Sequence, residues 1–228
     1  MAQPFDGIAD SYDRWYDTAD GQAIFEAELE CLRRLCPECR GRWLEIGVGT
    51  GRFASALGIA EGLDPSPKML HLAARRGIMA YLATAEHLPF PDASFGGCLL
   101  ALTLCFVDDP AQALTECRRV LRGEGSLLLG IIPADSPWGI AYERKKAEGH
   151  PVYAHARFLT SSKVVALAQE AGLVLNSAAS TLFWGPGQAP EIPPRLETGI
   201  VAGAGLLTLL FTRPALDSPP RPGGVRER

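Results

Sequence analysis

The chain has 228 residues, of which 47% are hydrophobic and 21% charged, and these values suit one domain with a full hydrophobic core. The formal net charge of -4 and the pI near 5.6 give no general attraction to a nucleic acid backbone or an anionic membrane surface. The apolar stretch at residues 199–211 is shorter than the ~20 residues of a membrane-spanning helix, and the first residues lack the pattern of a secretory signal. We therefore expect a cytoplasmic protein that neither crosses a membrane nor binds nucleic acid.

Apolar positions recur at helical spacing through residues 5–35, and short apolar runs alternate with amphipathic segments from residue 42 onward. We predict strands near residues 43–47, 60–64, 78–83, 96–105, 125–132, 173–183 and 205–212. Further helices are predicted near residues 51–58, 67–76, 110–121 and 161–171. Asp109 and Pro110 are typical of a helix start, and Gly172 of a helix end. This alternation predicts an α/β fold, with a Rossmann-like, doubly wound, mostly parallel sheet of seven strands, helices on both faces and an antiparallel edge strand.

Other segments stand outside this alternation. Residues 1–40 are predicted to form a helical cap within a single domain that covers residues 1–213. Residues 133–160 connect two predicted strands and contain prolines, aromatic residues and two histidines, which favours a lid or substrate-binding segment over an idle loop. Residues 214–228 are rich in proline and arginine and are predicted to be a disordered tail.

The sequence LEIGVGTGRF at residues 44–53 places Gly47, Gly49 and Gly51 directly after a strand-like run. Glycines at a strand-to-helix turn let backbone N–H groups approach a ligand closely. A phosphate loop would need Lys and Ser or Thr after the last glycine, and a dinucleotide loop would need a small residue at Arg52, which disfavours a nicotinamide-dependent oxidoreductase. Asp64 ends the next strand, where a carboxylate can accept hydrogen bonds from ribose hydroxyls. The loop therefore suits an adenosine-containing cofactor without a pyrophosphate, and a tight turn without any ligand is the alternative.

Motifs of one family follow one another along the first part of the chain. They are FDGIADSYDRWYD at 5–17, LEIGVGTGRF at 44–53, GLDPSPKML at 62–70, ATAEHLPFPDASF at 83–95 and ALTLCFVDDPAQAL at 101–114. With these motifs the chain resembles the class I S-adenosylmethionine-dependent methyltransferases, including the subgroup that contains the quinone-biosynthesis C-methyltransferases. The resemblance implies S-adenosylmethionine as the cofactor and a small molecule as the methyl acceptor.

The resemblance also implies the cofactor contacts. Gly47, Gly49 and Gly51 would line the methionine and ribose portion, Glu45 would lie near the methionyl amine, and Asp64 would hold the ribose hydroxyls. The further cofactor-binding positions that it implies are Tyr12, Pro65, Met69, Ala85, Glu86, Leu102 and Thr103. Ala85 and Glu86 would lie at the adenine edge, and Leu102 and Thr103 beside the sulfonium. For Met69, a core position on an amphipathic helix is the alternative.

Two positions depart from the family pattern. Thr84 stands where relatives usually have an aspartate that accepts from the adenine amino group, and Gly96 stands where they usually have an aspartate too. A non-catalytic relative that binds the cofactor in a regulatory or assembly role therefore stays an alternative to an enzyme.

Methyl transfer from a sulfonium is an in-line displacement, in which a protein contributes position and desolvation more than reactive groups. The resemblance places Tyr12 and Tyr16 over the methionine end as a wall that excludes water, although they could equally pin the N-terminal helix to the core. Where the acceptor must lose a proton, His155 is the first candidate base, ahead of His150 and Tyr153. A structural or surface histidine is the alternative for His155.

Cys31, Cys36 and Cys39 have the spacing C-x4-C-x2-C, but the second paired motif of a typical structural zinc site is missing. We therefore predict no metal and free thiols for the six cysteines of the chain.

Overall fold

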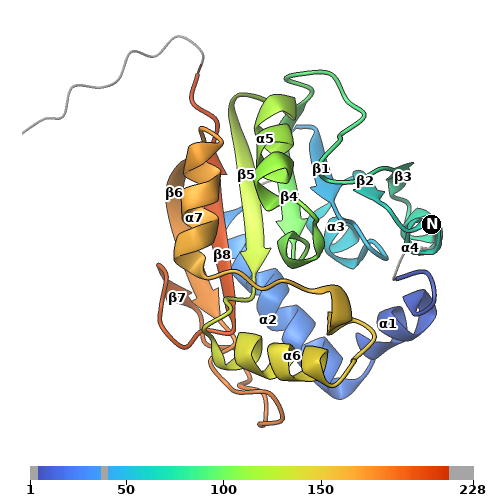
Figure 1. The fold of residues 1–228 in the computed structure, drawn as a ribbon, viewed down its shortest axis with the longest axis vertical. Coiled ribbons are helices and arrows are strands. Elements are labelled where there is room, and N and C mark those ends of the chain that lie inside the picture. The colour runs from blue at the N-terminus through green and yellow to red at the C-terminus, as the bar shows by residue number, and fades with distance from the viewer. Residues whose placement is uncertain (1–4, 37–40, 216–228) are drawn as a thin grey trace, which may run out of the picture.

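Eight strands form one sheet in the order β3-β2-β1-β4-β5-β8-β6-β7 in the computed structural model, which describes residues 5–36 and 41–215 (Figure 1). The strands are β1 (Trp43–Ile46), β2 (Glu61–Asp64), β3 (Met79–Leu82), β4 (Phe95–Ala101), β5 (Leu121–Ile131), β6 (Val174–Thr181), β7 (Glu197–Thr198) and β8 (Leu206–Thr212). The α-helices are α1 (Ala9–Trp15), α2 (Ala19–Leu35), α3 (Arg52–Leu57), α4 (Pro67–Arg75), α5 (Pro110–Val120), α6 (Pro137–Ala147) and α7 (Ser161–Glu170). Two short 3₁₀ turns are η1 (Leu104–Phe106) and η2 (Tyr153–His155).

The predicted Rossmann-like class is confirmed, with one correction to the strand count. Strands β1 to β5 pair in parallel, and β8 pairs antiparallel with both β5 and β6. The sheet has eight strands rather than seven, because β7 adds an antiparallel edge next to β6. This strand has only the two residues Glu197 and Thr198, which is too short for the apolar alternation that reveals a strand in a sequence.

Different helices cover the two faces of the sheet. Successive side chains of a strand point to opposite faces, so in β4 Cys98 and Leu100 pack with α5 and α7, whereas Leu99 packs with α2, α3 and α4. Figure 1 shows α5 and α7 together over one face. A third cluster joins α2 to α6 through Trp138 and Tyr142. The side chains of Cys98, Leu99 and Leu100 in β4 are fully buried, and burying each leucine contributes about 1.5–3 kcal/mol.

The strand order creates a crevice at one end of the sheet. The chain passes from β1 to β2 on one side, while β4 lies against β1 on the other. A crevice at the carboxyl ends of the strands is the usual ligand position at such a switch point. In Figure 1 the arrowheads of β4 and β5 point toward the end at which α1 and α6 lie. Residues of both helices line the cavities at this end, among them Tyr12 of α1 and Lys146 of α6.

The helix ends follow the predicted signals, with two differences. Asp109 caps α5 by accepting from the N–H groups of Ala111 and Gln112, and Gly172 follows α7 at a φ of +82°. The helical stretch predicted for residues 5–35 is broken, because Thr18 accepts from the N–H of Gly21 and starts a new helix there. Helix α6 is an addition within residues 133–160.

The described part of the chain contains no helix with the length and apolar character needed to span a bilayer. Cys31, Cys98, Cys105 and Cys117 are free thiols, whereas Cys39 lies outside the described residues, as does the predicted tail from residue 216 onward.

Candidate active site

The glycine-rich loop turns sharply after β1. Gly47, Gly49 and Gly51 all have positive φ values, of 73°, 52° and 84°, which glycine adopts without steric cost. The N–H groups of Gly47 and Val48 both donate to the carbonyl of Leu63, at 2.8 Å. These hydrogen bonds join the loop to β2 and hold it at the carboxyl end of the sheet.

The three glycines differ in what a side chain at each position would contact. A Cβ on Gly47 would lie 2.2 Å from the side chain of Thr103, and a Cβ on Gly51 would lie 3.0 Å from the backbone of Ala73 in α4. A Cβ on Gly49 would meet nothing within 4 Å. Gly47 and Gly51 therefore allow close packing, whereas Gly49 presents bare backbone to open space.

Asp64 at the end of β2 holds the same loop. Its Oδ2 accepts from the N–H of Gly49 at 3.0 Å, and its Oδ1 accepts from the N–H of Ser66 at 2.8 Å. Burial raises the pKa of Asp64 to about 6, although the two N–H groups lower it. Each carboxylate oxygen keeps a lone pair, so Asp64 can accept two further hydrogen bonds from a ligand.

Glu45 lies in β1, just before the loop, and its side chain is buried. The residue is 1% exposed, its Oε2 has no hydrogen-bond partner among the described residues, and burial raises its pKa well above the usual range. A buried carboxyl oxygen without a partner is costly. A ligand cation near this loop would offset that cost.

A cavity of about 590 Å³, here called the glycine-loop cavity, opens beside these residues. Its walls include the predicted residues Tyr12, Gly47, Gly49, Asp64, Pro65, Met69, Ala85, Glu86, Leu102, Thr103 and His155. Glu45, Gly51 and Tyr16 are not on these walls. Wall residues that the sequence did not reveal include Phe5, Phe106, Asp108, Lys146 and Arg157.

A second cavity, of about 450 Å³ and here called the aromatic cavity, adjoins the first. Its aromatic walls come from α1 and Tyr16 after it, η1, α6, η2 and Phe158. The two cavities share Tyr12, Leu102 and Phe106. Leu102 has a φ of +58°, and its N–H donates to the carbonyl of Gly130 at 2.8 Å. This backbone conformation costs a bulky residue about 1–3 kcal/mol. The packing around the strand ends holds the conformation in place.

The candidate bases and Tyr16 are divided between the two cavities, and His150 lies beside Tyr153 in the aromatic cavity, with ring centroids 4.9 Å apart. His155 is exposed on the glycine-loop cavity, whereas Tyr16 and His150 line the aromatic cavity. The hydroxyl groups of Tyr12 and Tyr16 are 3.1 Å apart, and burial raises the pKa of Tyr12 to about 12 and that of Tyr16 well above its ordinary value. Both tyrosines are therefore neutral phenols near pH 7.

Comparisons with known proteins agree with this geometry. The family model described as Methyltransferase domain matches residues 44–129. A SAM-dependent methyltransferase of Thermotoga maritima, a possible histamine N-methyltransferase, has a crystal structure with a TM-score of 0.84 and 36% identity, covering 92% of this chain and 98% of that one. The chain belongs to the S-adenosylmethionine-dependent methyltransferases.

Two relatives extend this similarity to other organisms. Uncharacterized protein Rv2003c of Mycobacterium tuberculosis is 41% identical over 88% of this methyltransferase and 70% of its own length. Uncharacterized protein MJ1123 of Methanocaldococcus jannaschii is 40% identical over 78% of this chain and 85% of its own. The family and the fold establish S-adenosylmethionine as the cofactor, as the sequence motifs predicted.

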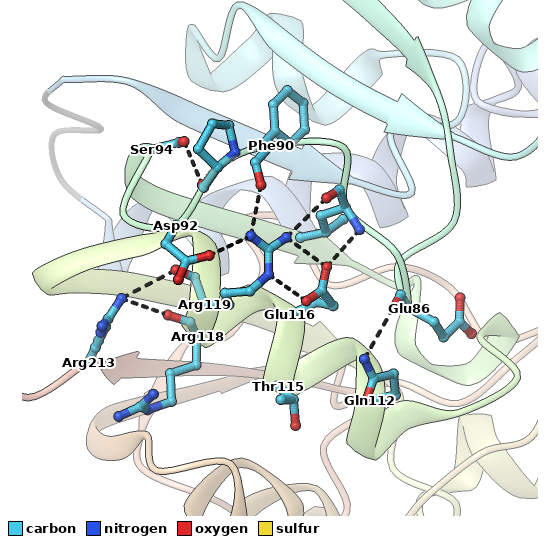
Figure 2. Close-up of polar contacts among 12 residues, drawn as sticks. Glu86, Phe90, Asp92, Ser94, Gln112, Thr115, Glu116, Arg118, Arg119 and Arg213 are labelled. Atoms are coloured by element: carbon cyan, nitrogen blue, oxygen red, sulfur yellow. Dashed lines mark hydrogen bonds and ion pairs between the residues drawn. The ribbon is translucent and has the colours of Figure 1, made fainter.

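A guanidinium anchors the segment that follows one wall of the methyltransferase's glycine-loop cavity (Figure 2). Arg119 of α5 donates to the carbonyls of Phe90 at 2.8 Å and Leu88 at 3.0 Å, and it pairs with Asp92 and Glu116. The same loop begins with Thr84, Ala85 and Glu86, which line the cavity. The Arg119 guanidinium lowers the pKa of Glu116, so this ion pair stays charged at neutral pH.

Glu86 itself is engaged by the loop before α5. Its Oε1 accepts from the N–H groups of Asp108 at 2.8 Å and Asp109 at 3.2 Å. The carboxylate thus joins two cavity walls, and its predicted position at the adenine edge stays a prediction.

A second ionic cluster fixes α1 over the cavity. Arg52, the residue that argues against a dinucleotide loop, donates to Asp13 and Asp17 at 2.8 Å, and Arg76 donates to Asp13 at 2.8 Å. Burial would raise the pKa of Asp13, but the hydrogen bonds from Arg52 and Arg76 lower it to about 2. Sequence reasoning missed this cluster, because each arginine lies 35 or more positions from the aspartate that it contacts.

Proposed function

We propose that the chain transfers the methyl group of S-adenosylmethionine to a small-molecule acceptor that binds in the aromatic cavity. The observation that carries this proposal is the junction of the two cavities at Tyr12, Leu102 and Phe106. A cofactor in one cavity and an acceptor in the other would meet there. The volume of about 450 Å³ is within the range of small-molecule sites.

The residues of the glycine-loop cavity suit the cofactor. Bare backbone at Gly49 leaves room for the nucleoside, and the free lone pairs of Asp64 match two ribose hydroxyl donors. The unpartnered oxygen of Glu45 would attract the methionyl ammonium, through water because Glu45 is not on the wall. Met69 would pack on the adenine, and Thr103 would lie near the sulfonium.

The bound cofactor supplies an activated methyl group, so the protein's part is to bind, orient and exclude water. Tyr12 stands between the cavities and would shield the junction from solvent. Tyr16 would contact the acceptor as a neutral hydroxyl, because burial raises its pKa. His155 is exposed on the cofactor side and would serve as a base only for an acceptor that reaches past Leu102.

The test has a binding step and a turnover step. Calorimetric titration with S-adenosylhomocysteine measures the first, and release of S-adenosylhomocysteine from S-adenosylmethionine with amine, thiol, phenol and quinone acceptors measures the second. Histamine belongs in this panel, because a structural relative is a possible histamine N-methyltransferase. We expect micromolar binding and turnover of at least one acceptor class. Binding without any turnover would favour the non-catalytic alternative, and no heat at millimolar ligand would overturn the cofactor site.

A further inference from the structure

A carboxyl group is buried in the wall of the aromatic cavity. Glu28 lies in α2, is 3% exposed, and lines the cavity together with Ile24 from the preceding turn. Its Oε2 has no hydrogen-bond partner among the described residues. An unpartnered buried carboxyl oxygen costs several kcal/mol if it is ionised, and a cationic ligand in the cavity would offset that cost.

Aromatic rings surround the same space. Tyr12 and Tyr16 approach edge to face with centroids 5.5 Å apart, and Tyr142 and Tyr153 stack at 4.1 Å. The ring faces carry partial negative charge and attract cations. The rings can already hold a positive group, since Lys145 Nζ lies 5.5 Å from the Tyr142 centroid and 5.9 Å from that of Tyr153.

Two features of the wall favour a cation, the Glu28 carboxyl and the ring faces. A carboxylate and ring faces both favour a cation and both disfavour an anion. The exposed Asp20 and Lys145 also line the cavity, with opposite charges that solvent screens more strongly than it screens Glu28. Where Glu28 is ionised, its buried carboxylate thus dominates the selectivity.

We propose that the aromatic cavity binds a methyl acceptor that carries a basic, positively charged nitrogen, with Glu28 as the group that pairs with this charge. This inference rests on the proposed function, because it names the class of acceptor for the same site. It assigns to Glu28 a part in binding and in specificity.

The ionisation of Glu28 would link binding to pH. Burial raises the pKa of Glu28 to about 8. Other groups on the cavity do not titrate in the same range: burial raises the pKa of Tyr12 to about 12, that of Cys105 to about 12, and those of Tyr16, Tyr142 and Tyr153 well above their ordinary values. Behind Glu28 on α2, burial raises the pKa of Cys31 to about 11. Burial and the charge of Lys145 lower the pKa of His150, so it is neutral above pH 7.

The probe for this inference is benzyltrimethylammonium, a permanent cation that cannot itself be protonated or methylated. Benzyl alcohol and phenylacetate serve as neutral and anionic counterparts. The protein is saturated with S-adenosylhomocysteine, and the three compounds are titrated by calorimetry at pH 7 and pH 9. We expect the cation to bind at least tenfold more tightly than either counterpart at pH 9. Its affinity should fall by about tenfold at pH 7, because Glu28 takes up a proton there.

Two variants locate the effect. Glu28→Gln keeps the shape of the side chain and should lose both the preference for the cation and the pH dependence. Glu30→Gln makes the same charge change at an exposed position of the same helix and should keep both. Equal binding of cation and alcohol by the unmodified protein, or an unchanged preference in Glu28→Gln, would overturn the inference. If S-adenosylhomocysteine binds normally in that case, the inference falls alone, whereas failure of that ligand to bind removes the proposed function too.

Discussion

The carboxylate of Asp64 accepts a hydrogen bond from the N–H of Gly49 across 3.0 Å, which ties the end of β2 to the one loop glycine whose open side faces the cavity. One contact thus sets both the shape of the backbone cradle and the position of the acidic group beside it. Substitutions at the two residues should separate these contributions.

Filling the space at Gly49 should abolish cofactor binding. We expect Gly49→Leu to weaken the affinity for S-adenosylhomocysteine by at least 100-fold, because the new side chain occupies the cavity beside the backbone. Gly58→Leu is the matched control, since Gly58 also has a positive φ, of 71°, and open space at its Cβ, but does not line the cavity. Both variants should lose about 1 kcal/mol of stability from the backbone strain. Equal affinities in a calorimetric titration of the two variants would contradict the assignment.

Removing the Asp64 side chain should weaken cofactor binding without abolishing it. We expect Asp64→Ala to cost about 1–3 kcal/mol of binding free energy through lost hydrogen bonds to the ribose. The measurement is again titration with S-adenosylhomocysteine, and an affinity equal to that of the unmodified protein would show that Asp64 only shapes the loop.

The raised pKa of Asp64 also predicts a pH dependence of binding. Burial raises this pKa and the two N–H donors lower it, which leaves it at about 6 in the free protein. Ribose hydroxyls donate to the ionised form, so bound ligand lowers the pKa and affinity rises as pH increases from 5 to 7. We expect a gain of up to about tenfold over this range. Asp64→Asn should bind S-adenosylhomocysteine with little dependence on pH, whereas His155→Gln should keep the rise in affinity. If His155→Gln loses that rise, the pH dependence belongs to His155 and not to Asp64.

The sequence predicted the centre of this site better than its surroundings. Gly47, Gly49 and Asp64 belong to short motifs whose chemistry is local, and the structure brings all three to one cavity. Glu45 is buried in β1 and is not on the cavity wall, so its predicted place near the methionyl amine stays a prediction.

Other features depend on contacts between distant segments. Glu28 has no local signal, since a charged residue in an amphipathic helix is expected on the solvated face, whereas the folded chain leaves it only 3% exposed. Helix α6 was missed because few of its residues are apolar at helical spacing, although Ser136 and Pro137 are a recognisable start. Strand β7 was missed because of its two-residue length.

The guanidinium of Arg119 should control the wall of the glycine-loop cavity without touching the ligand. We expect Arg119→Ala to lower the free energy of unfolding by about 1–3 kcal/mol, because two carbonyls and two carboxylates lose a charged partner. Affinity for S-adenosylhomocysteine should fall as well, since the loop that begins with Thr84 is released. Arg122→Ala removes an exposed arginine nearby whose hydrogen bonds are 3.4 Å long, and it should change neither quantity measurably. Urea denaturation with and without ligand gives both values, and equal behaviour of the two variants would contradict the positioning role.

The buried carboxyl of Glu28 should make the stability of the protein fall as pH rises. Its pKa is about 8 in the folded chain, against 4.5 as the ordinary value, because burial disfavours the charge. Between these two values the unfolded chain has lost the proton while the folded chain keeps it, so each unit of pH removes up to about 1.4 kcal/mol of stability. Below pH 4.5 both states are protonated and there is no effect, and above pH 8 the loss is complete. Glu28→Gln does not titrate, so its stability relative to the unmodified protein should rise by roughly 4 kcal/mol between pH 5 and pH 9. Glu30→Gln should follow the unmodified protein across the same range, and parallel unfolding curves for all three proteins at both pH values would show that Glu28 is ionised without cost.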